Sequence, residues 1–449
     1  MTGYSETVLL SKYNVPVQIL ISAGEASGEM YGAQLIEALR RASVGTGLRP
    51  VQAERSSAAA DAGRGAPSTL PPTLRVGEDG SETRPYTNLQ FFGAGGDRMR
   101  AASCEIIVDA KDLAVVGITE ILSHLPKIYR LFRKLIRAAD NKQPKLAIVI
   151  DSPAFNWRVA RQMRKRGIPV VYYVCPQFWA WRQGRVKLLR KYINQALVIF
   201  PFEENFYRVH GVNATFVGHP LADLPTPEIS RMHYAAQQAL DHGKPWIALM
   251  PGSRRKEVRM NLPTILEAAG KLGQDYEFLL PVARTLEPSF LKELIGNRDI
   301  HLVPEAMPAL HHSRAGIIAS GTATVEAAIM GTPFVMVYRV SPLTYMLGKP
   351  RVKVPHYAMV NLIAGEEVVP ELVQHEFTAG NVVAELRKII PDGDPRTRML
   401  QGLASVKAKL KKPDQDGGNA SERAAEVILR MLTPAIAEPN LSQAPELWG

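Results

Sequence analysis

The sequence predicts an α/β protein built from two Rossmann-like domains, whose parallel sheets face a common cleft. Short apolar runs of strand length alternate with helical patterns in both halves of the chain, which is typical of parallel sheets covered by helices. Glycine-rich turns directly follow several of these runs in each half. The chain has 449 residues, which is long for one hydrophobic core and ordinary for two domains.

In the N-terminal half, apolar runs bounded by turn-forming residues predict strands near 17–22, 88–92, 146–150, 169–174, 196–200 and 214–217. Apolar residues at helical spacing predict helices near 29–41, 126–139 and 154–166. The second of these helices is expected to begin near Pro126, because proline is favoured in the first turn of a helix.

The C-terminal half repeats the pattern, with strands expected near 246–250, 277–281, 316–319 and 334–338 and helices near 258–272, 321–330 and 418–432. Between the halves, segment 218–230 is rich in proline and polar residues, and we interpret it as a hinge. This divides the chain into domains 1–222 and 223–449. One alternative is that the last predicted helix, 418–432, packs back on the N-terminal domain.

Segment 44–87 does not fit this scheme. It is rich in Ala, Gly, Pro, Ser and Arg and has almost no periodic apolar residues. Such a composition cannot bury enough apolar surface to fold alone, so we interpret it as a disordered insertion at a surface loop.

Composition limits the classes of protein. Hydrophobic residues make up 46% and charged residues 22%, as in ordinary globular proteins. Two cysteines are too few for a disulfide framework, and no apolar run reaches the roughly 18 residues that span a membrane. We therefore expect a cytoplasmic protein. A net charge of +11 indicates nucleic acid, an anionic membrane or a phosphorylated substrate as partner, and a merely solvated charged surface is the alternative.

The first glycine-rich turn carries polar residues at the carboxyl edge of the first predicted sheet. Gly24 and Gly28 permit close backbone approach, and Glu25 and Ser27 offer polar groups, although such residues also cap helices. The later motif GAGGDRM is a weak dinucleotide signal because Arg98 occupies the third glycine position.

Asp151 directly follows a predicted central strand, where open α/β sheets bind ligands. A carboxylate partly desolvated by its neighbours can serve there as a general base. The competing interpretation is that Asp151 only caps the helix near 154–166.

Two turns in the C-terminal half suit phosphate groups. Ser253 and Arg254 occupy one turn, where backbone amides and a guanidinium could hold a diphosphate. Ser320, Gly321, Thr322 and Ala323 form the other, with Glu326 one helical turn further on, placed to accept from a ribose diol or simply to cap. We find no convincing metal site in the sequence, and none is predicted.

Two segments combine cations with aromatic or apolar residues. Segment 176–192 carries Phe178, Trp179 and Trp181 among arginines and lysines, and segment 124–140 predicts an amphipathic helix with a basic face. Such segments bind nucleic acid, sugars or membranes, or form packed core with a solvated basic face.

The assembled motifs resemble the lipid-A-disaccharide synthase family. They are AGEASGEMYGA, GAGGDRM, VVGITEIL, IDSPAFN, PQFWAWRQGRVKLL, FPFEENFY, FVGHPLAD, MPGSRRKEV, ASGTATVEAA, VYRVSPLTY and NLIAGEEVVPEL, in the family's order. The resemblance implies a GT-B glycosyltransferase that inverts configuration. It would join UDP-2,3-diacylglucosamine to 2,3-diacylglucosamine 1-phosphate, forming a β-1,6 disaccharide and UDP. It further implies no cofactor, peripheral association with the inner membrane, and no nucleic-acid partner, and it leaves a homodimer open.

Residue by residue, the resemblance implies that Asp151 is the essential aspartate, that Glu25 and Ser27 are the polar pair of the first turn, and that Asn361 is the asparagine of the Asn-Leu motif. Arg254, Gly321, Thr322 and Glu326 match positions expected around UDP. The chain departs from the family at Glu29, where aspartate is usual, and at Ala154, where a second acidic residue is usual. The second departure leaves Asp151 as the better base.

Two alternatives of other kinds share some of these features. A UDP-sugar 2-epimerase would have the same two-domain architecture but no use for an amphipathic surface. A nucleic-acid-binding protein would use the same cations, and its binding would fall steeply with salt.

Overall fold

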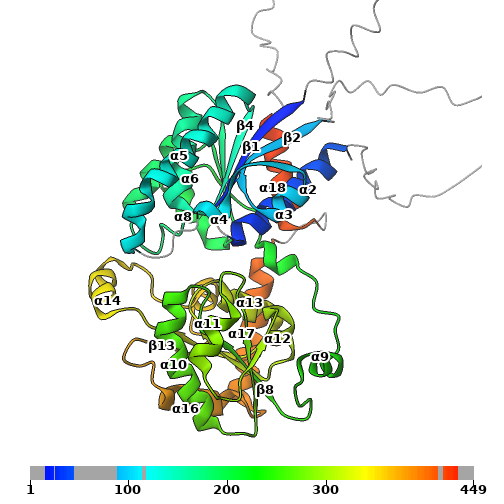
Figure 1. Cartoon of the computed structure of the whole chain (residues 1–449), viewed down its shortest axis with the longest axis vertical. Helices are drawn as coiled ribbons and strands as arrows, with labels where there is room; N and C mark the ends of the chain where they lie inside the picture. Colours follow the sequence, from blue (N-terminus) through cyan, green and yellow to red (C-terminus); the bar gives the residue numbers. More distant parts are fainter. Residues whose placement is uncertain (1–15, 25, 45–87, 114–117, 413–417, 433–449) are drawn as a thin grey trace, which may run out of the picture.

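Two parallel sheets, one in each half of the chain, organise the structure, which is a computed structural model (Figure 1). It describes residues 16–24, 26–44, 88–113, 118–412 and 418–432. Glu25 and nearly all of the predicted insertion 44–87 lie outside the described residues.

The N-terminal sheet has the strand order β3-β2-β1-β4-β5-β6-β7, with all neighbours parallel. Its strands are β1 (Val17–Ala23), β2 (Leu89–Gly95), β3 (Cys104–Asp109), β4 (Leu146–Ile150), β5 (Val170–Tyr173), β6 (Gln195–Val198) and β7 (Ala214–Phe216). The six predicted strands are confirmed, and β3 was missed. It is an edge strand that mixes buried and exposed positions, so it lacks the apolar run of the central strands.

Helices cover both faces of this sheet because its strands are buried on both sides. Ile19 and Ile21 face one core, with α2 (Ala26–Val44), and Leu20 faces the other, with α5 (Ile118–Lys142) and α6 (Pro153–Lys165). The expected start of the basic helix near Pro126 was wrong, since α5 begins at Ile118 and Pro126 lies inside it. The remaining helices of this half are α3 (Asp97–Ala101), α4 (Ala110–Leu113), α7 (Val186–Tyr192) and α8 (Pro201–Val209).

The C-terminal sheet has the order β10-β9-β8-β11-β12-β13, again with all neighbours parallel. Its strands are β8 (Trp246–Met250), β9 (Glu277–Pro281), β10 (His301–Val303), β11 (Ala315–Ala319), β12 (Phe334–Tyr338) and β13 (Glu371–Val373). Its helices are α9 (Arg231–Gln238), α10 (Arg255–Leu272), α11 (Pro288–Ile295), α12 (Ala306–His312), α13 (Thr322–Met330), α14 (Pro342–Gly348), α15 (Met359–Ala364), α16 (Ala379–Ile389) and α17 (Asp394–Leu410). The predicted α/β class with two parallel sheets is therefore confirmed.

The chain crosses between the two halves twice, and the two crossings contact each other. The amide of His219 donates to the carbonyl of Leu410 at 2.9 Å, and Arg423 Nε donates to the carbonyl of Val217 at 2.7 Å. After the second crossing, α18 (Ala420–Leu432) lies against α2 of the N-terminal half (Figure 1). Among the described residues, no helix is both long and apolar enough to cross a membrane.

Candidate functional site

The predicted site residues follow the strands at which each sheet reverses its direction of growth. In the N-terminal sheet β1 and β4 are neighbours, and their ends lead into Gly24 and Asp151. In the C-terminal sheet β8 and β11 are neighbours, and their ends lead into segment 251–254 and Ser320. Ligands of open α/β sheets bind at this position, because the flanking helices run to opposite faces and leave a crevice.

Asp151 begins a turn that the structure holds in an unusual backbone conformation. Asp151 and Ser152 have φ values of +48° and +46°, in the left-handed region that side chains disfavour. The buried side chain of Asn156 stabilises this turn, because its Nδ2 donates to the carbonyls of Ile150 and Asp151 at 2.8 and 2.9 Å. The Ser22 hydroxyl donates to Asn156 Oδ1 at 2.7 Å, which ties the turn to β1.

The C-terminal half approaches this turn through α13. Helix α13 contacts the short turn Pro220–Asp223, and its Glu326 lies close enough to influence Tyr31 of α2. The pKa of the Tyr31 hydroxyl is raised, first by burial and then by neighbouring groups that include Glu326 and Asp151. Burial also raises the pKa of Glu326. The charge of a carboxylate from each domain thus raises the pKa of the same tyrosine.

The first glycine turn packs directly on the Asp151 turn. A Cβ atom added to Gly24 would lie 2.4 Å from Ser152 Oγ, so glycine is needed there. Gly28 is different, because a Cβ atom there would meet its neighbours at an ordinary 3.6 Å. Ser27 is half-buried in the first turn of α2. Glu29, where the family usually has aspartate, accepts from the Arg98 amide at 2.7 Å and so holds the GAGGDRM turn.

The turn before α10 is already occupied by a side chain of the same helix. Glu257 Oε2 accepts from the amides of Ser253 and Arg254 at 3.2 and 3.3 Å, and its other oxygen pairs with the Arg254 guanidinium at 3.0 Å. Helix α10 is therefore capped by its own Glu257. A diphosphate would have to compete with the Glu257 carboxylate for these amides.

The turn before α13 is open. Gly321 is the N-cap of α13 with no side-chain capping bond, and both Gly321 and Thr322 are exposed. Gly321 has φ +138°, and nothing lies within 4 Å of the position its Cβ would take. Uncapped amides at a helix N-terminus attract anions, so residues 321–323 form the better of the two candidate phosphate sites.

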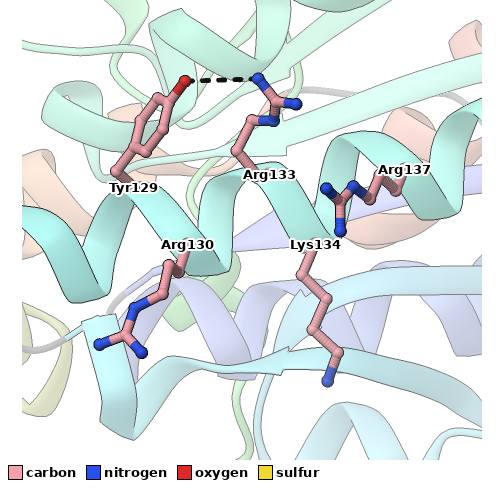
Figure 2. Close-up of a pocket in the computed structure, with 5 residues that line it drawn as sticks. All are labelled: Tyr129, Arg130, Arg133, Lys134 and Arg137. Atoms are coloured by element: carbon pink, nitrogen blue, oxygen red, sulfur yellow. Dashed lines mark hydrogen bonds between the residues drawn. The ribbon is translucent and has the colours of Figure 1, made fainter.

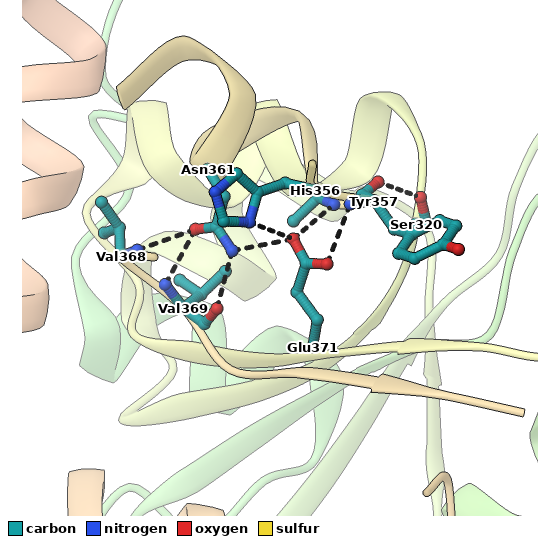
Figure 3. Close-up of polar contacts among 8 residues, drawn as sticks. Ser320, His356, Tyr357, Asn361, Val368, Val369 and Glu371 are labelled. Atoms are coloured by element: carbon teal, nitrogen blue, oxygen red, sulfur yellow. Dashed lines mark hydrogen bonds and ion pairs between the residues drawn. The ribbon is translucent and has the colours of Figure 1, made fainter. Parts of the chain in front are cut away.

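Asn361 holds the loop behind this open turn. It is fully buried, accepts from the amides of Val368 and Val369 at 2.8 and 3.0 Å, and donates to Glu371 Oε1 at 2.8 Å (Figure 3). Glu371 in turn accepts from the amides of Tyr357 and Ala358 at 2.8 and 2.9 Å.

The chain of contacts reaches the open turn before α13, because Ser320 Oγ donates to the Tyr357 carbonyl at 2.8 Å (Figure 3). The structure thus places Ser320 at the open turn and Asn361 behind it. Since the Asn361 side chain is buried and engaged on both its oxygen and its nitrogen, its role here is positioning.

Cations of the two domains also approach each other. The pKa of Arg98 is lowered by burial and then by the charge of Arg284, which follows β9. A bound anionic group would relieve this repulsion between like charges.

The basic face of α5 lies outside this region. Tyr129, Arg130, Arg133, Lys134 and Arg137 line a hollow of about 580 Å³ along one helix (Figure 2). In the second cationic segment, 176–192, some aromatic side chains are buried and one is exposed. Phe178 and Trp179 are buried core, whereas Trp181 is 45% exposed and has the Arg182 guanidinium 4.3 Å from its ring centre.

Sequence reasoning missed several residues that shape the site. Asn156 is buried beside the Asp151 turn, and its place in the quoted IDSPAFN motif was the signal that could have been used. Tyr31 and Glu371 gave no such signal, because their partners lie in distant parts of the sequence. No group of three or more His, Cys, Asp or Glu side chains in the described part of the chain could hold a metal ion.

Comparisons with known proteins agree with this fold. S. aureus MnaA, in a co-structure with UDP, superposes with a TM-score of 0.56 at 13% identity, over 93% of this chain and 97% of that one. CalG4, the calicheamicin glycosyltransferase, superposes with a TM-score of 0.53 at 13% identity, over 94% of this chain and 99% of that one. At such identities the likeness concerns the fold, which is the two-domain GT-B architecture.

The family model described as lipid-A-disaccharide synthetase matches residues 78–420. The lipid-A-disaccharide synthase of Koribacter versatilis is 48% identical over 417 residues, which is 92% of this chain and 98% of that protein. The chain belongs to the lipid-A-disaccharide synthase family, and it is a glycosyltransferase of lipid A biosynthesis. The resemblance seen in the sequence is confirmed.

Proposed function

We propose that the protein transfers 2,3-diacylglucosamine from its UDP-activated form to 2,3-diacylglucosamine 1-phosphate, with inversion at the anomeric carbon. The observation that carries this proposal is the pairing of a carboxylate turn after β4 with an open, uncapped helix N-terminus after β11. The first suits proton abstraction from an acceptor hydroxyl, and the second suits the leaving diphosphate.

In this mechanism Asp151 takes the proton of the acceptor's 6-hydroxyl as that oxygen attacks the anomeric carbon from the side opposite UDP. The carbon–oxygen bond to UDP breaks at the same time, and the electron pair leaves with the diphosphate. The α13 amides stabilise the negative charge that develops on the diphosphate, because the helix dipole is positive at this end. Closure of the two domains would bring the base and the phosphate site together.

Arg254 and Ser253 are the second contact proposed for the nucleotide. Arg254 is exposed, and it pairs with Glu257 at the turn that follows β8. We propose that the diphosphate draws this guanidinium away from Glu257. Glu326 is proposed to accept from the ribose hydroxyls, and Gly28, Ser27 and Glu25 to border the acceptor.

The basic face of α5 suits an anionic membrane surface, where both acylated substrates reside. Its cations Arg130, Arg133, Lys134 and Arg137 are exposed on a single helix, and the neighbouring Lys127 pairs with Asp112 at 2.8 Å. We therefore propose peripheral binding at the inner membrane through this face.

The test is UDP release from the acylated UDP-glucosamine, measured with and without the monosaccharide 1-phosphate. We expect release to require both substrates, to persist in EDTA, and to yield a β-1,6 linkage by NMR. UDP release without acceptor would identify a hydrolase or an epimerase instead. Loss of activity in EDTA that magnesium restores would contradict metal-independent transfer.

A further inference from the structure

An apolar pocket of about 400 Å³ lies where the two domains meet. Six apolar side chains line it, together with two polar ones. Four of the apolar residues come from the N-terminal half and two from the C-terminal half: Trp179, Phe202, Phe206, Val209, Val354 and Leu362. This volume is in the usual range for small-ligand pockets.

One wall of the pocket is fixed by a buried carboxylate. Glu203 is 1% exposed and accepts from Trp179 Nε1 at 2.8 Å and from the amide of Phe200 at 3.1 Å. The Phe202 ring packs edge-on against Trp179 with ring centres 4.8 Å apart. Because burying a carboxylate is unfavourable, its use to orient an indole indicates a wall whose shape matters.

The opposite wall is brought to the pocket by contacts between the domains. The amide of Lys353 donates to the carbonyl of Ala180 at 2.9 Å, and Trp181 and Val352 form an isolated antiparallel bridge. These contacts set Val354 beside the segment that carries Trp179.

The pocket also adjoins the site. Leu362 directly follows Asn361, whose network reaches the open turn through Ser320. On the other side, Trp179 belongs to the segment that follows β5, and the Asp151 amide donates to the last residue of β5, Tyr173, at 3.2 Å. The chain and its hydrogen bonds thus connect the pocket to both halves of the candidate site.

We propose that this pocket receives one acyl chain of the acceptor, an inference that rests on the proposed function. Most of its wall belongs to the domain that carries Asp151, the group proposed to act on the acceptor hydroxyl. Val209 is 75% exposed at the edge of this apolar wall, so a bound chain would cover apolar surface that now faces water.

The test measures binding of 2,3-diacylglucosamine 1-phosphate with long or short acyl chains, by titration without donor and below the micelle concentration. For the native protein, each methylene group that enters the pocket should strengthen binding about fourfold. Val209→Trp narrows the pocket and Val209→Asp places a charge at its edge. We expect both variants to bind the long-chain acceptor about tenfold more weakly and the short-chain acceptor unchanged.

Met232→Trp and Met232→Asp are matched controls, since Met232 is also exposed, at 68%, but lies on α9 outside the pocket. The inference is overturned if the Val209 variants lose both acceptors equally, lose neither, or behave like the Met232 variants. The proposed function fails separately, if the native protein binds the acceptor but releases no UDP when donor is added.

Discussion

Asp151 occupies a backbone conformation that asparagine tolerates as well as aspartate does, because short polar side chains can adopt positive φ. The substitution Asp151→Asn should therefore keep the turn and remove only the base. We expect transfer to fall by about 10²- to 10⁴-fold with UDP affinity unchanged, as measured by product formation and by nucleotide titration.

Asp140→Asn is the control for this prediction, since Asp140 pairs with Arg166 at 2.6 Å on the surface of the same domain. Turnover of Asp151→Asn within a few-fold of this control would remove Asp151 from the mechanism.

Glu203 makes stability depend on pH. Burial raises its pKa from 4.5 to about 7, so between these values the folded protein retains a proton that the unfolded chain has released. The free energy of unfolding should therefore fall as pH rises across this window, by on the order of 3 kcal/mol in total. Denaturant unfolding of native protein and Glu203→Gln at pH 5 and 7 should show the native protein losing this advantage.

The comparison with Glu203→Gln is needed because His219 acts in the opposite direction. Burial lowers the pKa of His219 to about 3, so its contribution to stability is lost as pH falls below 6.5. A difference between the two proteins that stays constant with pH would show that Glu203 is ionised in the fold throughout.

Among single residues, the sequence was sufficient to predict those candidate site residues that directly follow apolar strands. Asp151, Gly24 and Gly321 were placed because a parallel sheet fixes where its strands end. It could not find Tyr31, Glu371 or the pairing of Trp179 with Glu203, because each depends on packing between segments remote in the sequence. Nor could it tell that Glu257 already occupies the turn before α10 while the candidate turn before α13 is open.

At the scale of single elements, the basic face of helix α5 can be tested as a membrane-binding surface. Arg130, Lys134 and Arg137 are exposed at spacings that align along the helix. Reversing all three to glutamate should weaken binding to anionic vesicles strongly, since each cation near the surface contributes about 1 kcal/mol. Salt should release the native protein, because the attraction is screened within about 10 Å at 0.1 M.

Arg387, Lys388 and Arg398 supply the matched control, since they are exposed cations of the C-terminal domain whose reversal gives the same net charge. If the two triple variants bind vesicles equally in a sedimentation assay, total charge rather than this face is responsible.

Elements were predicted from the sequence where they are central and uniformly apolar. The edge strands β3, β10 and β13 were missed because they include exposed or half-exposed positions, and β10 and β13 have only 3 residues each. The start of α5 was misplaced because the helix accommodates Pro126 in its interior, which the general preference for proline at helix starts does not anticipate.

At the scale of the whole molecule, helix α18 links the two halves, because it crosses back to cover α2. Arg423 is buried beside the first crossing, and the Ala420 amide donates to Asp223 at 2.7 Å. A chain ending at residue 412 should therefore lose stability in its N-terminal domain, with thermal unfolding several degrees lower, while a chain ending at 432 should match the full protein. Equal melting temperatures would show that α2 does not need this cover.

The same helix has a consequence for the order of synthesis. Helix α2 ends at Val44 and the helix that covers it begins at Ala420, so α2 leaves the ribosome well before its partner. At about 5–20 residues per second, α2 waits on the order of tens of seconds for its partner while the entire C-terminal domain is made. During that time the apolar face of α2 that α18 covers in the folded protein lacks its partner.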